Sequence, residues 1–281
     1  MKIIQGKLCG LCAGVDYTIK EAKKSLKENK TVYCLGEIVH NEKVIESLEN
    51  EGMITVQNIE EVPNGSKLIF RAHGEAKEVY ETAKRKNIDV IDLTCGKVRA
   101  IHINVEREKE NSFIIIIGKK SHPEIIGTKG FAGDNSSVIE NEEDIKISYE
   151  EYKKTNLKKV YIVAQTTFSS LKFNGLVEKI KEVFDNAEII VKNTICDATE
   201  NRQKEVEEIS KKVDKMLIIG GKHSSNTKEL ANIAEKNCKN VYLIQDKDDL
   251  KSLKFNDYDT IGIMSGASTP REVVEEIKKG I

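Results

Sequence analysis

Short apolar runs alternate with charged, amphipathic stretches along the whole chain. The apolar runs are rich in β-branched residues and bounded by Gly, Asn, Asp or Ser, as is typical of buried parallel strands. This pattern predicts strands at 31–35, 67–70, 89–92, 113–117, 160–164, 215–219, 241–244 and 260–264. It predicts helices at 16–28, 41–50, 76–86, 97–109, 170–184, 199–212, 225–236 and 270–279. Because strands and helices alternate, we expect an α/β fold with parallel sheets.

Three cysteines stand at predicted strand-to-helix junctions, and polar residues follow them at repeated distances. The cysteines are Cys12, Cys95 and Cys196. The first polar residues that repeat after these cysteines are His40, His122 and Ser224, which follow them at distances of 28, 27 and 28 residues. The second set of repeated polar residues is His73, Thr166 and Ser268, and each of them follows another predicted strand. We therefore predict three similar α/β units, at 14–95, 96–192 and 193–281, the last completed by residues 1–13. Chance spacing among βα units is the alternative, and the repeated residue types argue against it.

Open parallel sheets bind ligands outside the carboxyl ends of their strands. Three such units around a pseudo-threefold axis, a trefoil, would direct all nine residues at one central point. Three thiolates without a fourth are unusual, because structural zinc sites and electron-transfer iron–sulfur clusters usually have four protein ligands. They suit a cubane cluster with one open iron, and zinc held by three cysteines and a histidine or water stays open.

Two further segments have the chemistry of anion sites. Lys222–Asn226 opens a predicted helix with hydroxyl and amide donors, and Gly266–Ser268 precedes another helix. The chain has neither a P-loop nor a dinucleotide-binding glycine motif, so a small diphosphate is favoured over a nucleotide. Glu124, two residues after His122, could relay a proton, although the residues alone favour the simpler interpretation of a first-turn helix charge.

Composition and charge narrow the function further. The 45 basic and 46 acidic residues give a net charge of -1, which argues against nucleic-acid binding by bulk electrostatics. The longest apolar run, 113–118, falls far short of the ~18 residues that span a bilayer. The N-terminal MKIIQGKL is too short for a signal peptide. We expect a cytoplasmic protein in which all six cysteines are reduced thiols.

The motifs together resemble a known family. GLCAGV, EIVHN, RAHG, DLTC, HPEIIGTKG, QTT, ICDATENRQ, SSN and GAS occur in family order over nearly all of the chain. The chain resembles the 4-hydroxy-3-methylbut-2-enyl diphosphate reductases, enzymes of the last step of the non-mevalonate (MEP/DOXP) pathway of isoprenoid biosynthesis.

The resemblance implies a trefoil fold and a set of roles for particular residues. A [4Fe–4S] cluster would be held by Cys12, Cys95 and Cys196, and Glu124 would donate protons. The substrate-binding set would be His40, His73, His122, Thr166, Ser224, Ser225, Asn226 and Ser268. The implied reaction is a two-electron, two-proton reductive dehydroxylation that yields isopentenyl and dimethylallyl diphosphates. The implied electron donor is ferredoxin or flavodoxin, and we expect a monomer.

One position departs from the family, which usually has proline after the second cluster cysteine where this chain has Gly96. Cys9, Cys34 and Cys238 match no ligand motif and are expected to be bystanders. Two other functions remain open from sequence: a non-catalytic module that binds metal or diphosphate, and a paralogue that reduces another allylic diphosphate.

Overall fold

The computed structural model describes residues 1–281 and has an α/β fold with three four-stranded sheets, in all of which the strands are parallel. The predicted fold class is therefore confirmed. The chain divides into two compact units. Unit 1 comprises Met1–Tyr17, Val39–Glu46 and Asp197–Ile281, and unit 2 comprises Thr18–Ile38 and Ser47–Cys196. The three domain boundaries given above stay a prediction.

Unit 1 contains one sheet, which the N-terminal segment completes. Its strand order is β1 (Lys2–Gln5), β12 (Thr260–Ser265), β10 (Lys215–Ile219) and β11 (Val241–Ile244). Its helices are α8 (Asp197–Ser210), α9 (Ser225–Glu235) and α10 (Arg271–Lys279), with a 3-10 segment η2 (Lys247–Ser252). Buried residues of β10 and β12 form the core with apolar residues of these helices. Because β1 pairs with β12, the loop after β1 begins beside the loop after β12.

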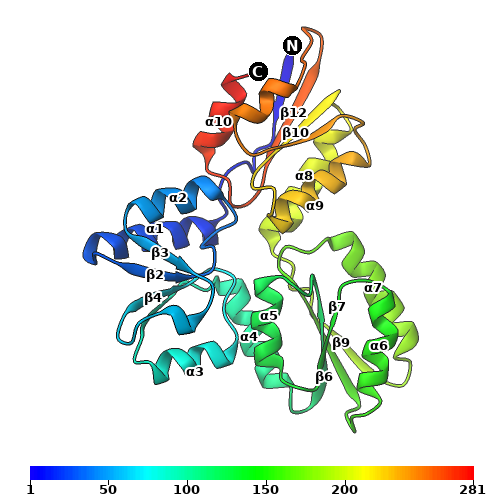
Figure 1. Cartoon of the computed structure of the whole chain (residues 1–281). Helices are drawn as coiled ribbons and strands as arrows, with labels where there is room; N and C mark the ends of the chain where they lie inside the picture. The colour runs from blue at the N-terminus through cyan, green and yellow to red at the C-terminus, as the bar shows by residue number, and fades with distance from the viewer. The chain divides into compact units, whose positions relative to one another are not determined.

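The first sheet of unit 2 has the order β3 (Met53–Val56), β2 (Val32–Leu35), β4 (Lys67–Phe70) and β5 (Asp89–Asp92). The accompanying helical segments are α1 (Ala13–Glu28), α2 (Glu42–Asn50), η1 (Ile59–Glu61) and α3 (Lys77–Arg85). Figure 1 shows α1 and α2 on one side of this sheet and α3 on the other. Leu68 and Phe70 of β4 pack with Ala83 of α3, so the sheet is buried beneath that helix.

The second sheet of unit 2 has the order β7 (Ser136–Ile139), β6 (Ser112–Ile117), β8 (Lys159–Ala164) and β9 (Glu188–Val191). Its helices are α4 (Gly96–Glu108), α5 (Pro123–Ala132), α6 (Glu143–Tyr152) and α7 (Ser170–Val183). Alternate residues of the fully buried strand β6 face two different cores, one with α4 and α5 and one with α6 and α7. Figure 1 shows this sheet between its two helical layers.

Four strands and two helices were absent from the predicted elements. The strands are β1, β3, β7 and β9, and each lies at the edge of its sheet and has only four residues. The helices are α5 and α6. Helix α5 carries Gly127 and Gly130 in its interior, which lowers its intrinsic helix propensity. Its start is nevertheless well specified, because Pro123 occupies the first turn and the His122 side chain caps it.

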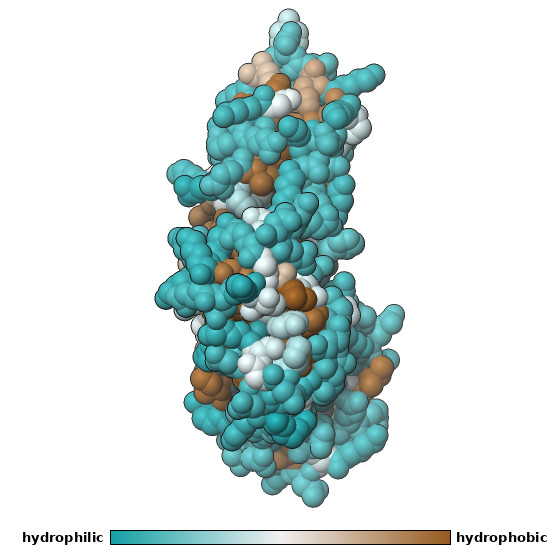
Figure 2. Space-filling view, turned by 60° about the vertical axis from the view of Figure 1, so that its left-hand side comes forward, coloured by the Kyte–Doolittle hydropathy of each residue, from teal (hydrophilic) through white to brown (hydrophobic).

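The face of the molecule drawn in Figure 2 is mostly hydrophilic. In the face drawn in Figure 2, apolar residues occur as small separate groups among polar ones. None of the helices is both long enough and apolar enough to pass through a lipid bilayer.

Candidate functional site at the strand ends

The three predicted ligand cysteines occupy the same local position in the three sheets. Cys12, Cys95 and Cys196 each immediately precede a helix, namely α1, α4 and α8. Each cysteine also donates its backbone N–H to the loop after a neighbouring strand: Cys12 to Ala267 O (2.9 Å), Cys95 to Ala72 O (3.0 Å) and Cys196 to Thr166 O (3.0 Å). The repeat predicted from spacing thus corresponds to a repeated backbone hydrogen bond.

These three thiols suit a metal better than the other three do. All six cysteines are free, but only Cys12, Cys95 and Cys196 are partly exposed. A helix N-terminus stabilises a thiolate, and Val15 N donates to Cys12 Sγ at 3.5 Å. By contrast, burial raises the pKa of the Cys9 thiol to about 11 and that of Cys34 to about 12. Among the cysteines, the donors best suited to a metal are therefore these three.

Glu124 is a buried carboxyl group with two hydrogen bonds from a single residue. Thr166 donates its backbone N–H to Glu124 Oε1 (2.6 Å) and its hydroxyl to Glu124 Oε2 (2.7 Å). Burial raises the pKa of Glu124 to about 7, although these hydrogen bonds lower it in part. Glu124 can therefore hold a proton near neutral pH. Because Thr166 O also accepts from Cys196 N, one residue connects the acid to a predicted ligand cysteine.

Two predicted histidines of unit 2 lie beside this acid. His122 Nδ1 accepts a hydrogen bond from Glu124 N (3.2 Å), so the ring proton of the neutral imidazole lies on Nε2. The His73 ring meets that of His122 edge to face, with centroids 5.2 Å apart. His73 occupies a turn closed by the bond from Gly74 N to Arg71 O (3.0 Å). Gly74 has a φ of 72°, and a Cβ there would meet His102 at 2.6 Å, so glycine is required.

Unit 1 holds its predicted polar residues at the ends of β10 and β12. Ser268 Oγ donates to His40 O (3.3 Å), which joins the loop after β12 to the segment 39–46. The Ser224 side chain caps α9 by accepting from Thr227 N (3.3 Å). Asn226 is buried, and its Nδ2 donor has no hydrogen-bond partner. A buried donor without a partner is costly, so this amide is suited to a ligand oxygen.

The two units share the predicted site residues equally. Unit 1 carries Cys12, His40, Ser224, Ser225, Asn226 and Ser268. Unit 2 carries His73, Cys95, His122, Glu124, Thr166 and Cys196. Within each unit they lie at or just after the carboxyl ends of parallel strands, or at helix starts. Their roles in binding and catalysis stay predictions.

Sequence reasoning assigned no role to two residues within the quoted motifs. Asn41 accepts from Val44 N (3.2 Å) at the start of α2, and its Nδ2 donates to Ser268 O (3.2 Å). An asparagine directly before a helix is a capping signal that could have identified it. Arg202 is buried on α8 and donates to Gly10 O (2.9 Å). No local pattern distinguishes this arginine from a surface one, because its partner is distant in sequence.

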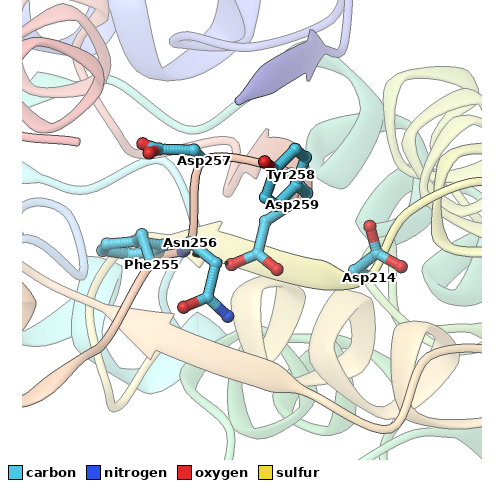
Figure 3. A pocket seen from close by; sticks show the side chains of 6 residues that line it. All are labelled: Asp214, Phe255, Asn256, Asp257, Tyr258 and Asp259. Atoms are coloured by element: carbon cyan, nitrogen blue, oxygen red, sulfur yellow. Dashed lines mark hydrogen bonds between the residues drawn. The ribbon is translucent and has the colours of Figure 1, made fainter.

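A hollow of about 620 Å³ in unit 1 lies at the opposite edge of its sheet. Its lining comprises Asp214 and residues 255–259, which precede β10 and β12 (Figure 3). Two of its three carboxylates already have partners: Asp214 accepts from Thr260 N (2.8 Å), and Asp259 pairs with Lys215. This hollow lies at the amino ends of the strands, so we do not place the site there.

The fold and these residues define an α/β protein whose three parallel sheets each end in a helix-start cysteine with polar residues nearby. The family model described as LytB protein matches residues 3–281. The chain belongs to the LytB protein family.

Named relatives agree with this assignment. A 4-hydroxy-3-methylbut-2-enyl diphosphate reductase of a Thermoanaerobacter species is 40% identical, with 100% of this chain and 96% of the relative covered. The reductase of that name from Aquifex aeolicus is 37% identical, and the match covers 99% of this chain and 95% of the relative. The solved structure of the E-1-hydroxy-2-methyl-but-2-enyl-4-diphosphate reductase from Plasmodium falciparum has a TM-score of 0.87 at 34% identity, covering 99% of this chain and 87% of its own.

Proposed function

We propose that the chain is a 4-hydroxy-3-methylbut-2-enyl diphosphate reductase, an iron–sulfur oxidoreductase of isoprenoid biosynthesis. It would remove the hydroxyl group of its substrate reductively, with two electrons and two protons, and release isopentenyl or dimethylallyl diphosphate and water. Its full-length relatives carry this name. The structural observation that carries the proposal is the chain of hydrogen bonds from Glu124 through Thr166 to Cys196.

The donor set fits a [4Fe–4S] cluster on Cys12, Cys95 and Cys196. Stable electron-transfer clusters of this kind have four cysteine ligands, whereas three leave one iron without a protein ligand. The three cysteines are partly exposed and each stands at a helix start, whereas the other three cysteines are buried. When bound, such a cluster would supply electrons to the substrate. We expect ferredoxin or flavodoxin to supply electrons to the protein.

Each unit carries polar donors of the kind that a diphosphate requires. Asn226 offers a buried amide donor without a partner, and Ser224 caps a helix start, where the backbone dipole favours anions. His122 presents an Nε2–H donor because its Nδ1 is already an acceptor. We assign the diphosphate to these residues together with His40, His73, Ser225 and Ser268. Hydrogen bonds to a charged ligand of this type each contribute about 1.5–3 kcal/mol.

Glu124 is the proposed proton donor, and Thr166 transmits the proton. With Glu124 protonated on Oε2, the carboxyl group becomes the donor in its bond to Thr166 Oγ1. The Thr166 hydroxyl hydrogen is then free to turn to the departing hydroxyl group of the substrate. The proton lost from Thr166 is replaced by the proton on Glu124, and solvent must restore the latter in each cycle.

Metal analysis tests the cluster directly. Protein reconstituted anaerobically should contain about four irons and four sulfides per chain and show the broad brown absorbance of a cubane cluster. Stoichiometric zinc without iron in freshly purified anaerobic protein would overturn the cluster assignment. Zinc held by three cysteines and a histidine or water would then replace the cluster as the assignment.

A further inference from the structure

The segment between β1 and Cys12 is held by two side chains of a single helix. Arg202 of α8 donates from Nη2 to Gly10 O (2.9 Å) and from Nη1 to Ala198 O (3.0 Å). Glu205, one turn further along α8, accepts from Lys7 N (2.6 Å) and Leu8 N (3.0 Å). We call Arg202 and Glu205 the α8 clamp, because between them they bind one carbonyl and two amides of the loop 7–10.

The clamp acts on the loop that contains Cys9, the first cysteine of the C-x-x-C pair, and that leads to Cys12, the second. Within this loop Cys9 is buried, with Sγ directed to Ile263 O (3.7 Å), whereas Cys12 is partly exposed at the start of α1. Gly10 lies between the two thiols with a φ of 113°, a conformation that favours glycine. A further bond from Gly10 N to Ser265 Oγ (2.8 Å) fixes the same residue to the end of β12. The loop is thus held on both sides at the residue where its direction changes.

The clamp also connects two predicted ligand segments. Helix α8 begins directly after Cys196, and Arg202 binds Ala198 in its first turn. The same guanidinium binds Gly10, two residues before Cys12. Arginine suits this task, since its planar group donates to two carbonyls at once without losing its charge.

We propose that Arg202 and Glu205 are positioning residues that hold the loop 7–10 so that Cys12, and not Cys9, is presented to a metal. The ligand role of Cys12 rests on the proposed function, whereas the protection of Cys9 by the clamp does not. Burial raises the pKa of the Cys9 thiol most and the Glu205 carboxylate adds to this, while Ser265 and Arg202 lower it in part.

Residue-resolved alkylation tests the clamp without an activity assay. The full chain, as purified anaerobically and again after chelation of its iron, is treated with iodoacetamide, and each cysteine is followed by mass spectrometry. Cys34 and Cys238 are buried in the strand and helix cores and serve as internal controls for global unfolding. In the wild-type protein all three buried cysteines should react slowly.

In Arg202→Gln, we expect Cys9 to react with iodoacetamide roughly 10- to 150-fold faster. This is the factor, roughly 10- to 150-fold, by which the loss of a hydrogen bond to a charged group favours local opening of the loop 7–10. Cys34 and Cys238 should keep their wild-type rates. Glu205→Gln should have a smaller effect in the same direction, and Arg202→Lys should restore part of the protection. Glu208→Gln, an exposed change on the same helix, should leave every rate unchanged.

Unchanged Cys9 reactivity in both clamp variants would overturn the proposal. So would a parallel rise at Cys9, Cys34 and Cys238, because that pattern indicates general destabilisation. In reconstituted protein, the iron should also be lost to a chelator faster from Arg202→Gln than from Glu208→Gln. If the wild-type chain takes up no iron, the proposed function fails, while the alkylation pattern still decides the role of the clamp.

Discussion

Replacing Glu124 by glutamine separates the proposed proton donor from a structural carboxylate. Glutamine has the same size, its Oε1 can accept from Thr166 N, and its Nε2 can donate to Thr166 Oγ1. Both observed contacts therefore have equivalents in the variant. What the variant lacks is a proton that it can transfer at neutral pH, and the positioning of the substrate is left unchanged.

The expected loss lies in kcat. General acids contribute roughly 10²–10⁴-fold to rate, so Glu124→Gln should turn over at least about 100-fold more slowly. Its cluster content and its affinity for the substrate should remain close to those of the wild type. In the wild-type enzyme, burial places the pKa of Glu124 at about 7, so kcat should fall as the pH rises through that value if proton donation limits the rate.

The stability of the protein should also decrease as the pH rises. Burial holds the pKa of Glu124 at about 7 in the native state, above its ordinary value of 4.5, so the native protein binds more protons between these limits. Its stability must therefore decrease as the pH rises through this window, by up to roughly 3 kcal/mol at about 1.4 kcal/mol for each tenfold change in proton affinity. Glu124→Gln removes the titrating group, so its melting temperature should depend less on pH.

Steady-state kinetics under anaerobic conditions, combined with thermal melts at pH 5.5 and 8, checks both expectations. Glu108→Gln, a change at the last residue of α4, serves as the control and should alter neither kcat nor the pH dependence of melting. Normal turnover by Glu124→Gln with a lowered melting temperature at all pH values would refute the reasoning. Glu124 would then be a first-turn helix charge, and the proton source would be unassigned.

Three further results are expected. Changing any one of the three helix-start cysteines to serine should abolish the cubane absorbance, whereas Cys34→Ala, a change inside a buried strand, should keep it, as iron analysis will show. His40→Ala and Ser224→Ala should weaken substrate binding about 10- to 150-fold with smaller effects on kcat, and a normal KM in both would contradict their assignment to the diphosphate. Gly96→Pro should raise stability by about 0.4–1 kcal/mol in a denaturant titration, because Gly96 is the first residue of α4 and a Cβ there meets nothing within 4 Å. A loss of stability would instead show that this turn needs glycine.

The sequence predicted the interior strands well because their apolar content is continuous. The structure has strands at Lys67–Phe70 and Lys215–Ile219, as predicted, and both pair on two sides. The missed strands, such as Met53–Val56, all pair on one side only, although two other four-residue edge strands, β5 and β11, were predicted. Edge strands take their order from a neighbour, and the local sequence does not encode that neighbour.

Tertiary contacts also explain the missed helix α5. Its glycines disfavour a helix locally, but they allow close approach to the turn after His73. A Cβ on Gly127 would lie 3.4 Å from the backbone of Glu75, and one on Gly130 would lie 2.7 Å from Ala76 Cβ. The helix therefore forms because packing overrides propensity.

The chemistry of the candidate site was predictable in part. Residue types and spacing pointed to Cys12, Cys95 and Cys196, and the structure places all three directly before helices. The role of Arg202 was not predictable, because it depends on contact with a loop 192 residues away in sequence. The same holds for the bonds between Glu124 and Thr166, which join the start of helix α5 to the end of strand β8, 42 residues apart.

Product analysis after anaerobic turnover tests the central claim most directly. The cluster-loaded chain is incubated with (E)-4-hydroxy-3-methylbut-2-enyl diphosphate and a strong one-electron reductant, and the diphosphates are separated and identified. We expect consumption of the substrate with formation of both isopentenyl and dimethylallyl diphosphate, and no such products from Glu124→Gln in the same time. Quantitative recovery of unchanged substrate from fully loaded wild-type protein would contradict the assignment.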